Sequence, residues 1–296
     1  MLTSCLYANY IRKSLNQEER YGKGSWAVVT GATGGIGEAF CKQLAQKNFN
    51  IVLIGRSKEK LEESEKNIKS VNSNTKTLIV QADLDETLDP KFYENIHSQV
   101  KNLDISILVN NAGHGRAYPF ELIGAEEAIG NIRLNAGSPA MLTHSLINGM
   151  LKREKRSAII NVSSIGQNSP LPYLGVYPAT KRFLSFFSYS LHDNFKHKID
   201  VQDLTPGYVS TKIANFKKGS DTITADKCVK CSLRDLGQSI NCIPVVAHSI
   251  MALTMRSTHN FLFPFWRENV AGAAEKMALR SYMTENEEKK KQKKDD

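Results

Sequence analysis

The sequence predicts an α/β fold: a single domain built on one doubly wound parallel sheet with helices on both faces. Three observations predict it. Short β-branched runs alternate with longer segments of helical apolar spacing from about Ser25 to Thr205. The strand candidates are almost continuously apolar, as in parallel sheets that are covered on both faces. A glycine-rich turn directly follows the first strand candidate, where such folds bind nucleotides.

Six strand candidates follow one another along the chain, separated by helical segments. Apolar residues at helical spacing, such as Ile36, Phe40 and Leu44, mark the first of these segments. Beyond about residue 211 we expect helices that close over the carboxyl edge of the sheet on the substrate side. The strand candidates are Trp26–Thr30, Asn50–Ile54, Thr77–Gln81, Ile105–Val109, Ala158–Val162 and Asp200–Leu204.

The domain is expected to span residues 25–270, after an N-terminal segment of residues 1–24. Residues 285–296 carry five Lys, three Glu and two Asp, and this charged tail is predicted to be disordered. No signal peptide is evident, and the apolar start of the chain is too short to span a bilayer. The apolar stretch Ile243–Trp266 is split by Arg256, so core packing or contact with a membrane surface fits it better.

Composition limits the classes of partner. The 296 residues are 41% hydrophobic and carry a net charge of +9, which suits a nucleotide phosphate, an acyl-CoA or a lipid headgroup. Nucleic acid is not expected, because no basic stripe with interleaved aromatic residues stands out. The five cysteines are thinly spread and odd in number, which indicates a reducing compartment. Cys228 and Cys231 form a C-x-x-C pair late in the chain, but neither a second knuckle nor a preceding first strand supports a metal or redox site.

A nucleotide-binding turn is predicted at T-G-A-T-G-G-I-G, from Thr30 to Gly37. Gly31 allows the tight turn, Gly35 lets the backbone approach a pyrophosphate, and Gly37 lets the following helix pack closely against the strand. The N-terminus of that helix offers free N–H groups to the phosphates. A strand candidate precedes this turn and a helical segment follows it, which is typical of a Rossmann-type motif. Thr33 and Ile36 of the same turn are also expected to contact the cofactor.

Arg56 and Ser57 follow the second strand candidate, where an enzyme built for NAD usually carries a carboxylate for the ribose 2′-hydroxyl. A guanidinium at this point suits a 2′-phosphate, so the sequence predicts NADP(H) as the cofactor. The alternative is that Arg56 is simply the first solvated residue after a strand. Asp83 follows the third strand candidate and is expected at the adenine edge.

From about residue 25 to 211 the chain resembles the short-chain dehydrogenase/reductase family. The family's T-G-x-x-x-G-x-G falls on the turn just described, and its Y-x-x-x-K falls on Tyr177 and Lys181. The resemblance also assigns a catalytic serine to Ser164, thirteen residues before the tyrosine, and a helical asparagine to Asn135. The remaining matches are N-N-A-G at Asn110–Gly113, which places Asn111 at the cofactor, and the P-G turn at Pro206-Gly207.

These residue types suit the reduction of a ketone, which needs a hydride on carbon and a proton on oxygen. Tyr177 is the expected proton donor, and the Lys181 ammonium on the same helix face is expected to lower the tyrosine pKa. Ser164 is expected to bond the substrate oxygen. The resemblance implies that Lys181 also bonds the nicotinamide ribose, and that Asn135 holds a water that links Lys181 to solvent. Pro178 is expected to place Tyr177 just ahead of the helix, because a residue before proline avoids the α region.

Within the family, the chain is most similar to the branch of 17β-hydroxysteroid dehydrogenases and very-long-chain 3-oxoacyl-CoA reductases, through strings such as G-S-W-A-V-V-T-G-A-T-G-G-I-G and I-I-N-V-S-S. The branch implies a lipid-like carbonyl substrate, either a 3-oxoacyl-CoA or a ketosteroid, and membrane-surface association. The K-K-D-D terminus resembles a dilysine retrieval signal, which would place the protein on the cytosolic face of the endoplasmic reticulum; a cytoplasmic enzyme is the alternative. A homo-oligomer is compatible with the sequence.

A second class of function is a non-catalytic structural or nucleotide-sensing subunit that keeps this fold. Loss of Tyr177, Lys181 or Ser164 would favour it, and all three residues are present.

Overall fold

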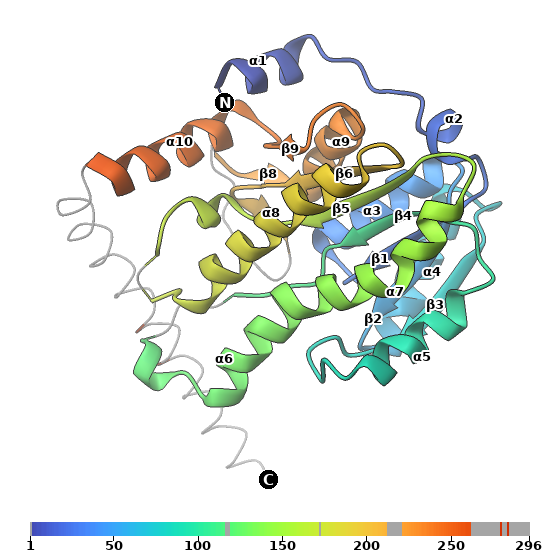
Figure 1. The fold of residues 1–296 in the computed structure, drawn as a ribbon, viewed down its shortest axis with the longest axis horizontal. Helices are drawn as coiled ribbons and strands as arrows, with labels where there is room; N and C mark the ends of the chain where they lie inside the picture. Colours follow the sequence, from blue (N-terminus) through green and yellow to red (C-terminus); the bar gives the residue numbers. More distant parts are fainter. Residues whose placement is uncertain are drawn as a thin grey trace.

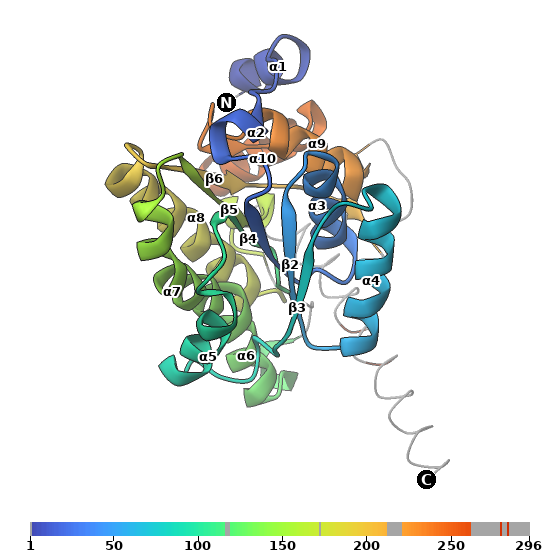
Figure 2. The same ribbon diagram turned by 90° about the vertical axis from the view of Figure 1, so that its right-hand side faces the viewer.

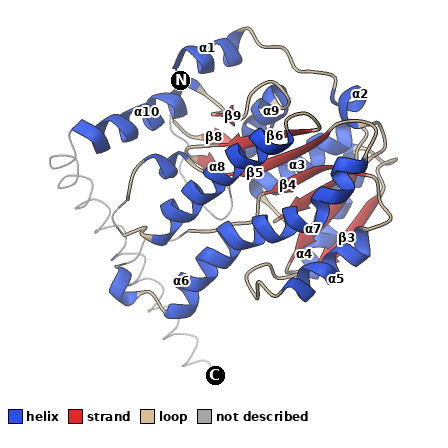
Figure 3. Cartoon of the chain, in the orientation of Figure 1, coloured by secondary structure: helices blue, strands red, loops and turns tan. Residues whose placement is uncertain are grey.

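A seven-stranded parallel sheet forms the centre of the molecule, with strand order β3-β2-β1-β4-β5-β6-β9 (Figures 1 and 3). The computed structural model describes residues 2–115, 119–171, 173–211 and 221–261, together with residues 279 and 283. The predicted fold class is confirmed, and all six predicted strands are present to within one residue at each end. The strands are β1 (Trp26–Thr30), β2 (Asn50–Gly55), β3 (Thr77–Gln81), β4 (Ile105–Asn110), β5 (Ser157–Val162), β6 (Ile199–Leu204) and β9 (Asn241–Cys242).

Helices cover both faces of the sheet (Figure 2). Each face has its own hydrophobic core. Alternate strand residues supply the two cores: Val29 and Leu53 point to one face, whereas Val28 and Val52 point to the other. The first face is covered by α3 (Gly35–Gln46), α4 (Lys58–Val71) and α9 (Ala225–Asp235), and the second by α5 (Pro90–Val100), α7 (Ser138–Lys152) and α8 (Val176–Phe195).

Side-chain caps fix where several helices begin. Ser57 accepts a hydrogen bond from the backbone N–H of Lys60 at the start of α4, and Asp89 accepts one from that of Lys91 at the start of α5. Each cap satisfies a backbone donor that has no partner inside its helix. The cap at Ser57 also fixes the place of Arg56, which immediately precedes it at the end of β2.

The strand order reverses between β1 and β4: the chain continues from β1 to β2 and β3 toward one edge of the sheet, and from β4 to β5 and β6 toward the other edge. In open sheets of this kind the ligand site lies at such a switch point, beyond the carboxyl ends of the strands. Gly31 follows β1 here, Asn111 follows β4, Ser163 follows β5, and Thr205 follows β6. The residues predicted to bind cofactor and substrate therefore start from one edge of the sheet.

The segment after residue 211 differs in part from the prediction. Helix α9 does not close over the carboxyl edge: it lies against α3, and its buried Cys228, Val229 and Leu233 join the core of that face. The following β9 pairs with β6 and extends the sheet. Helix α10 (Val246–Phe261) packs on the turn η3 (Ile165–Asn168) that follows β5. A short parallel pair, β7 (Val209–Ser210) and β8 (Ile223–Thr224), completes this region.

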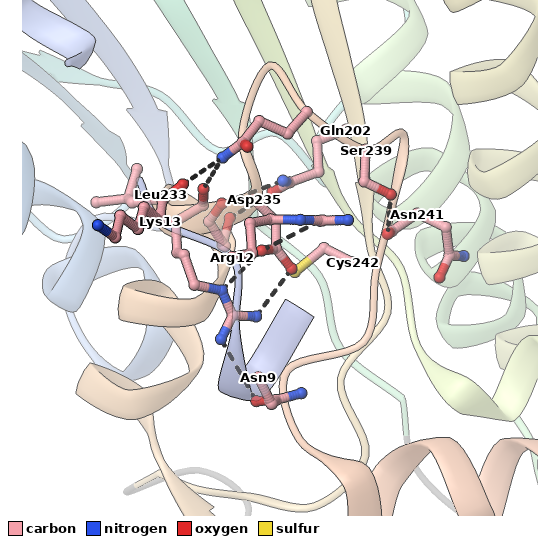
Figure 4. Close-up of polar contacts among 12 residues, drawn as sticks. Asn9, Arg12, Lys13, Gln202, Leu233, Asp235, Ser239, Asn241 and Cys242 are labelled. Atoms are coloured by element: carbon pink, nitrogen blue, oxygen red, sulfur yellow. Dashed lines mark hydrogen bonds and ion pairs between the residues drawn. The ribbon is translucent and has the colours of Figure 1, made fainter. Parts of the chain in front are cut away.

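The N-terminal segment packs on the domain through α1 (Leu2–Tyr10), which lies beside α10, and α2 (Gln17–Tyr21) (Figure 1). Figure 4 shows its contacts with the end of α9: Arg12 pairs with the buried Asp235 at 3.3 Å, and Arg234 donates to the side chain of Asn9. Gln238 donates to the Lys13 carbonyl at 2.8 Å.

Helix α2 is anchored to β6. Tyr21 is fully buried, and its hydroxyl donates to Asp200 at 2.8 Å. The same carboxylate pairs with Arg20 at 2.6 Å and with Arg156 at 2.8 Å. This cluster joins residues that precede the first strand to the start of β6.

Two further sequence features can be placed within the described residues. None of the described helices is both long enough and apolar enough to cross a bilayer. Cys228 and Cys231 are buried in α9 and form no disulfide. The described part of the chain contains no cluster of three metal-ligating side chains. The predicted tail at residues 285–296 lies outside the described residues.

Candidate active site

The glycine-rich turn after β1 has the geometry that a pyrophosphate site needs. Gly31 and Gly35 have φ angles of 62° and 54°, a region that favours glycine. A side chain on Gly37 could not be accommodated, because its Cβ would lie 2.1 Å from the Gly31 carbonyl oxygen. The turn therefore runs directly into α3, whose first N–H groups face the same edge of the sheet.

Asn111 holds this turn in place from the end of β4. Its side-chain amide donates to the Thr30 carbonyl at 2.9 Å, and its backbone N–H donates to the Thr30 hydroxyl, also at 2.9 Å. The N–H of Ala112 donates to the same hydroxyl. The side chain of Asn111 thus supports the turn, and the contact with the cofactor that the sequence predicts for this residue stays a prediction.

Two further predicted cofactor residues, Arg56 after β2 and Asp83 after β3, lie along the same edge of the sheet. Arg56 is exposed, and its guanidinium forms no ion pair with a carboxylate of the described residues. Asp83 caps its own turn by accepting from the backbone N–H of Asp85 at 3.1 Å. Two more predicted residues lie within the turn itself: Thr33 is next to Gly55 at the end of β2, and Ile36 packs against the core. Pro206 accepts from the N–H of Ile165 and so joins the β6 turn to η3.

Three of the four predicted catalytic residues meet beyond the ends of β5 and β6. Ser164 caps η3 by accepting from the N–H of Gly166 at 3.1 Å, and its hydroxyl is hydrogen-bonded to Tyr177. The Lys181 amine lies 5.7 Å from the centre of the Tyr177 ring and donates to the Val162 carbonyl at 2.9 Å. Strand β5 and helix α8 therefore bring a hydroxyl, a phenol and an amine together.

The expected effect of Pro178 is wrong. Helix α8 begins at Val176, so Tyr177 lies in its first turn and not ahead of it. Pro178 causes no disruption because its missing N–H would have had no partner in the first turn of a helix. The N–H of Tyr177 itself donates to the Leu174 carbonyl, which secures the entry into the helix.

The pKa of Tyr177 also differs from the expectation, which was a lowered value. Burial raises the pKa of Tyr177 above its usual value, and the hydrogen bond from Ser164 lowers it only in part. The pKa of Lys181 is lowered to about 8 by burial, against an opposing effect of Asp203. The Lys181 amine is directed to the Val162 carbonyl, and the expected lowering of the tyrosine pKa by this amine stays a prediction.

Asn135 lies in a single π-helical turn, η2 (Arg133–Gly137), between α6 (Ala125–Ile132) and α7. Its side chain is fully buried and bonds the backbone of His114 twice: it accepts from the N–H at 3.1 Å and donates to the carbonyl at 2.7 Å. π-turns are frequent at functional sites, where they direct a side chain out of the regular helical pattern. The loop after β4 is thereby fastened next to Lys181, since a Cβ on Gly113 would lie 2.5 Å from Asn135 and 3.0 Å from the Lys181 amine.

Two features of the site escaped prediction. Gly115 lies flat against the Tyr177 ring, where a Cβ would come within 2.3 Å. Asp203 is fully buried in β6 and acts on Lys181. A signal for Asp203 was present in the sequence, because a charged residue inside an otherwise buried parallel strand is unusual.

Comparison with known proteins agrees with this geometry. The family model "short chain dehydrogenase" matches residues 25–221. Very-long-chain 3-oxoacyl-CoA reductase of Rattus norvegicus is 37% identical over 250 residues, which cover 82% of this chain and 77% of the relative.

Two solved structures extend the comparison. A 7β-hydroxysteroid dehydrogenase is 25% identical with a TM-score of 0.74, covering 83% of this chain and 96% of that one. A metagenomic short-chain oxidoreductase in complex with NADP is 25% identical with a TM-score of 0.62, covering 75% and 96%. With its matching family model, its parallel sheet and its glycine turn, the chain belongs to the short-chain dehydrogenase family.

Proposed function

We propose that the chain is an NADPH-dependent reductase that converts a ketone on a lipid-like substrate into an alcohol, with Tyr177 as the proton donor. The observation that carries this proposal is the convergence of Ser164, Tyr177 and Lys181 beyond β5, on the same sheet edge as the glycine turn. Each of these groups has a chemical task in carbonyl reduction.

The residues present fit a dinucleotide. The backbone of the Gly31–Gly37 turn and the N-terminus of α3 would bind the pyrophosphate, and Arg56 would face a 2′-phosphate. When bound, the nicotinamide supplies the hydride for the carbonyl carbon.

Tyr177 donates its hydroxyl proton to the carbonyl oxygen as the alcohol forms. Ser164 donates a hydrogen bond to the same oxygen and stabilises the negative charge that develops on it. Lys181 stabilises the tyrosinate that remains, because an ammonium close to a phenolate favours the charged form. Asn135 holds the neighbouring loop, and by the family resemblance it also holds the water through which Lys181 is reprotonated.

Apolar side chains next to Tyr177 support a lipid-like substrate. A narrow crevice beside this residue is lined by Ile123, Leu174 and Val176 among others. Beyond it, Phe120 and Ile129 are exposed, at 67% and 45% of their surface. Exposed apolar residues grouped near a catalytic centre suit a hydrophobic ligand.

The substrate class is tested by following NADPH oxidation at 340 nm or so with the purified chain. Long-chain 3-oxoacyl-CoAs and 3- and 17-ketosteroids form the two arms. Turnover in either arm supports the proposal and selects the class. No turnover in both arms, with NADPH bound, would favour a nucleotide-sensing subunit instead.

For the cofactor we expect NADPH to bind at least tenfold more tightly than NADH, a difference of about 1.4 kcal/mol. The reason is the free, exposed guanidinium of Arg56 at the end of β2. In Arg56→Glu the preference should disappear or reverse, as measured by fluorescence titration with both nucleotides. Lys66→Glu is the matched control, since it makes the same charge change on the exposed side of α4 and should keep the preference. Equal binding of both nucleotides to the unaltered chain would refute the assignment.

For location we propose the cytosolic face of the endoplasmic-reticulum membrane. The basis is the K-K-D-D terminus, whose Lys293 and Lys294 lie outside the described residues. Changing both to Ser should redistribute the full chain away from that membrane, as seen by fractionation and imaging. Lys289→Ser with Lys290→Ser removes the same charge from the same tail and should not. An identical distribution of both double variants would exclude a dilysine signal.

A further inference from the structure

Strand β6 carries a carboxylate in the interior of the molecule, below the candidate active site. Asp203 is fully buried. It accepts hydrogen bonds from the hydroxyl of Ser185 at 2.7 Å, from the hydroxyl of Ser163, and from the side-chain amide of Gln167 at 3.5 Å. No Lys or Arg of the described residues forms an ion pair with it. A buried carboxylate held only by neutral donors is costly, so its presence calls for an explanation.

The three donors to Asp203 belong to the three elements that carry the site. Ser163 precedes Ser164 at the end of β5, and Gln167 lies in η3, which Ser164 caps. Ser185 lies on α8, one helical turn after Lys181, and so on the same face of that helix. One carboxylate therefore ties the strand end with the serine to the helix with the tyrosine and the lysine.

The charge of Asp203 acts on Lys181. Burial lowers the pKa of this lysine, and the negative charge of Asp203 is the opposing influence that keeps it at about 8. Two tyrosines on α8 also lie near Lys181 or Asp203: the ring of Tyr177 is 5.7 Å from the Lys181 amine, and the pKa of Tyr189 is raised by burial and then by the charge of Asp203. Burial raises the pKa of Asp203 itself, while its hydroxyl and amide donors favour the charged carboxylate.

We propose that Asp203 is a positioning residue of this active site, whose buried carboxylate fixes β5 and α8 relative to each other and keeps the Lys181 amine protonated. The inference rests on the proposed function, in which a charged Lys181 supports proton transfer from Tyr177. Its physical basis does not depend on the substrate: an anion that replaces the missing solvation of a buried ammonium favours the charged form.

The test is Asp203→Asn, which removes the charge and keeps the shape. We expect the alkaline limb of the kcat/KM profile for NADPH-dependent reduction to move down by about one pH unit, because without the anion Lys181 loses its proton more easily. At a pH near 6.5 the rate should stay within about threefold of the unaltered chain, and the loss should grow as the pH rises.

Asp200→Asn is the matched control, the same substitution on the same strand. Asp200 bonds Arg20, Arg156 and Tyr21 at the other end of β6 and does not act on Lys181. It should melt at a lower temperature and keep its alkaline limb. Asp203→Asn should melt no lower than the unaltered chain at pH 8. Burial raises the pKa of Asp203, so the protonated side chain stabilises the fold more than the charged one does, and this stability is lost as the pH rises through that pKa. Asn resembles the protonated form.

A second measurement needs no substrate. In the full chain labelled with 13Cε-lysine, the Lys181 resonance is assigned by its loss in Lys181→Arg. We expect its titration midpoint near 8 in the unaltered chain and a lower midpoint in Asp203→Asn. If the chain turns over no ketone, the proposed function fails and this midpoint still decides the role of Asp203.

An unchanged limb and an unchanged midpoint in a folded Asp203→Asn protein would overturn the inference. If Asp203→Asn does not fold, Asp203→Ser replaces it in both measurements. Failure of both variants to fold would also overturn it, because the carboxylate would then serve folding and not the site.

Discussion

Tyr177→Phe is expected to lower the turnover number by about 10²–10⁴-fold while leaving NADPH affinity nearly unchanged. Phe keeps the volume of the ring and its contact with Gly115, so the fold and the cofactor site should persist. Only the ionisable hydroxyl is lost, and with it the proton for the carbonyl oxygen. The burial that raises the pKa of Tyr177 keeps this proton in place at neutral pH, as a donor requires. The measurement is steady-state reduction of the best ketone, with NADPH binding followed separately.

Tyr93→Phe provides the control for this change. Tyr93 is also buried, but its hydroxyl bonds the Thr87 carbonyl beside α5, away from Ser164. It should lose a little stability, about 1 kcal/mol, and no activity. Retention of more than about a tenth of the unaltered rate by Tyr177→Phe would mean that another group is the acid, since a tenfold loss is below the range for general acid catalysis.

Gly37→Ala should weaken NADPH binding by at least about 10²-fold, which corresponds to roughly 2.7 kcal/mol. The new methyl would overlap the Gly31 carbonyl oxygen at 2.1 Å and the Asn111 amide at 2.6 Å. Relief requires α3 to move away from β1, which displaces the N–H groups that would bind the phosphates. Overpacking of this kind also costs about 1–3 kcal/mol of folding free energy. The measurements are a binding titration and thermal unfolding of the same sample.

Gly34→Ala separates this steric effect from a general intolerance of the turn. A Cβ on Gly34 has no atom within 4 Å, and the backbone there is extended, so alanine fits. Its affinity should remain within about threefold of the unaltered chain, under 1 kcal/mol. Equal affinities for both alanine variants would show that close packing at Gly37 does not shape the nucleotide site.

Sequence reasoning found the sheet because its strands are short apolar runs whose period differs from that of the helices. It missed β9, since Asn241–Cys242 is too short to show any period. Sequence reasoning misplaced α9 for a related reason. An amphipathic pattern predicts that one face of a helix is buried, but it does not identify the element on which that face packs. The apolar Val229 and Leu233 fit the side of α3 as well as they would fit the edge of the sheet.

Within the site, the family resemblance was enough to pair Ser164 with Tyr177, since it assigns the serine to the position thirteen residues before the tyrosine. The protonation state of Lys181 could not be predicted in the same way. The pKa of Lys181 depends on burial and on Asp203, which is 22 positions away in the chain and is brought near by the packing of α8 on β6. The π-turn at Asn135 was not predicted either, and its side chain bonds the backbone of His114, which is 21 positions away in the chain.

The contacts of the N-terminal segment bear on where the cooperative folding unit begins. The family match starts at residue 25, yet Arg20 and Tyr21 neutralise and cover Asp200 near the start of β6. A fragment cut at the family boundary would leave that carboxylate with Arg156 alone and would open a hole where a tyrosine ring belongs. The unit that folds cooperatively therefore begins before the residues that match the family: a truncation series should lose its sharp thermal transition between residues 13 and 21, before the family match at residue 25 is reached.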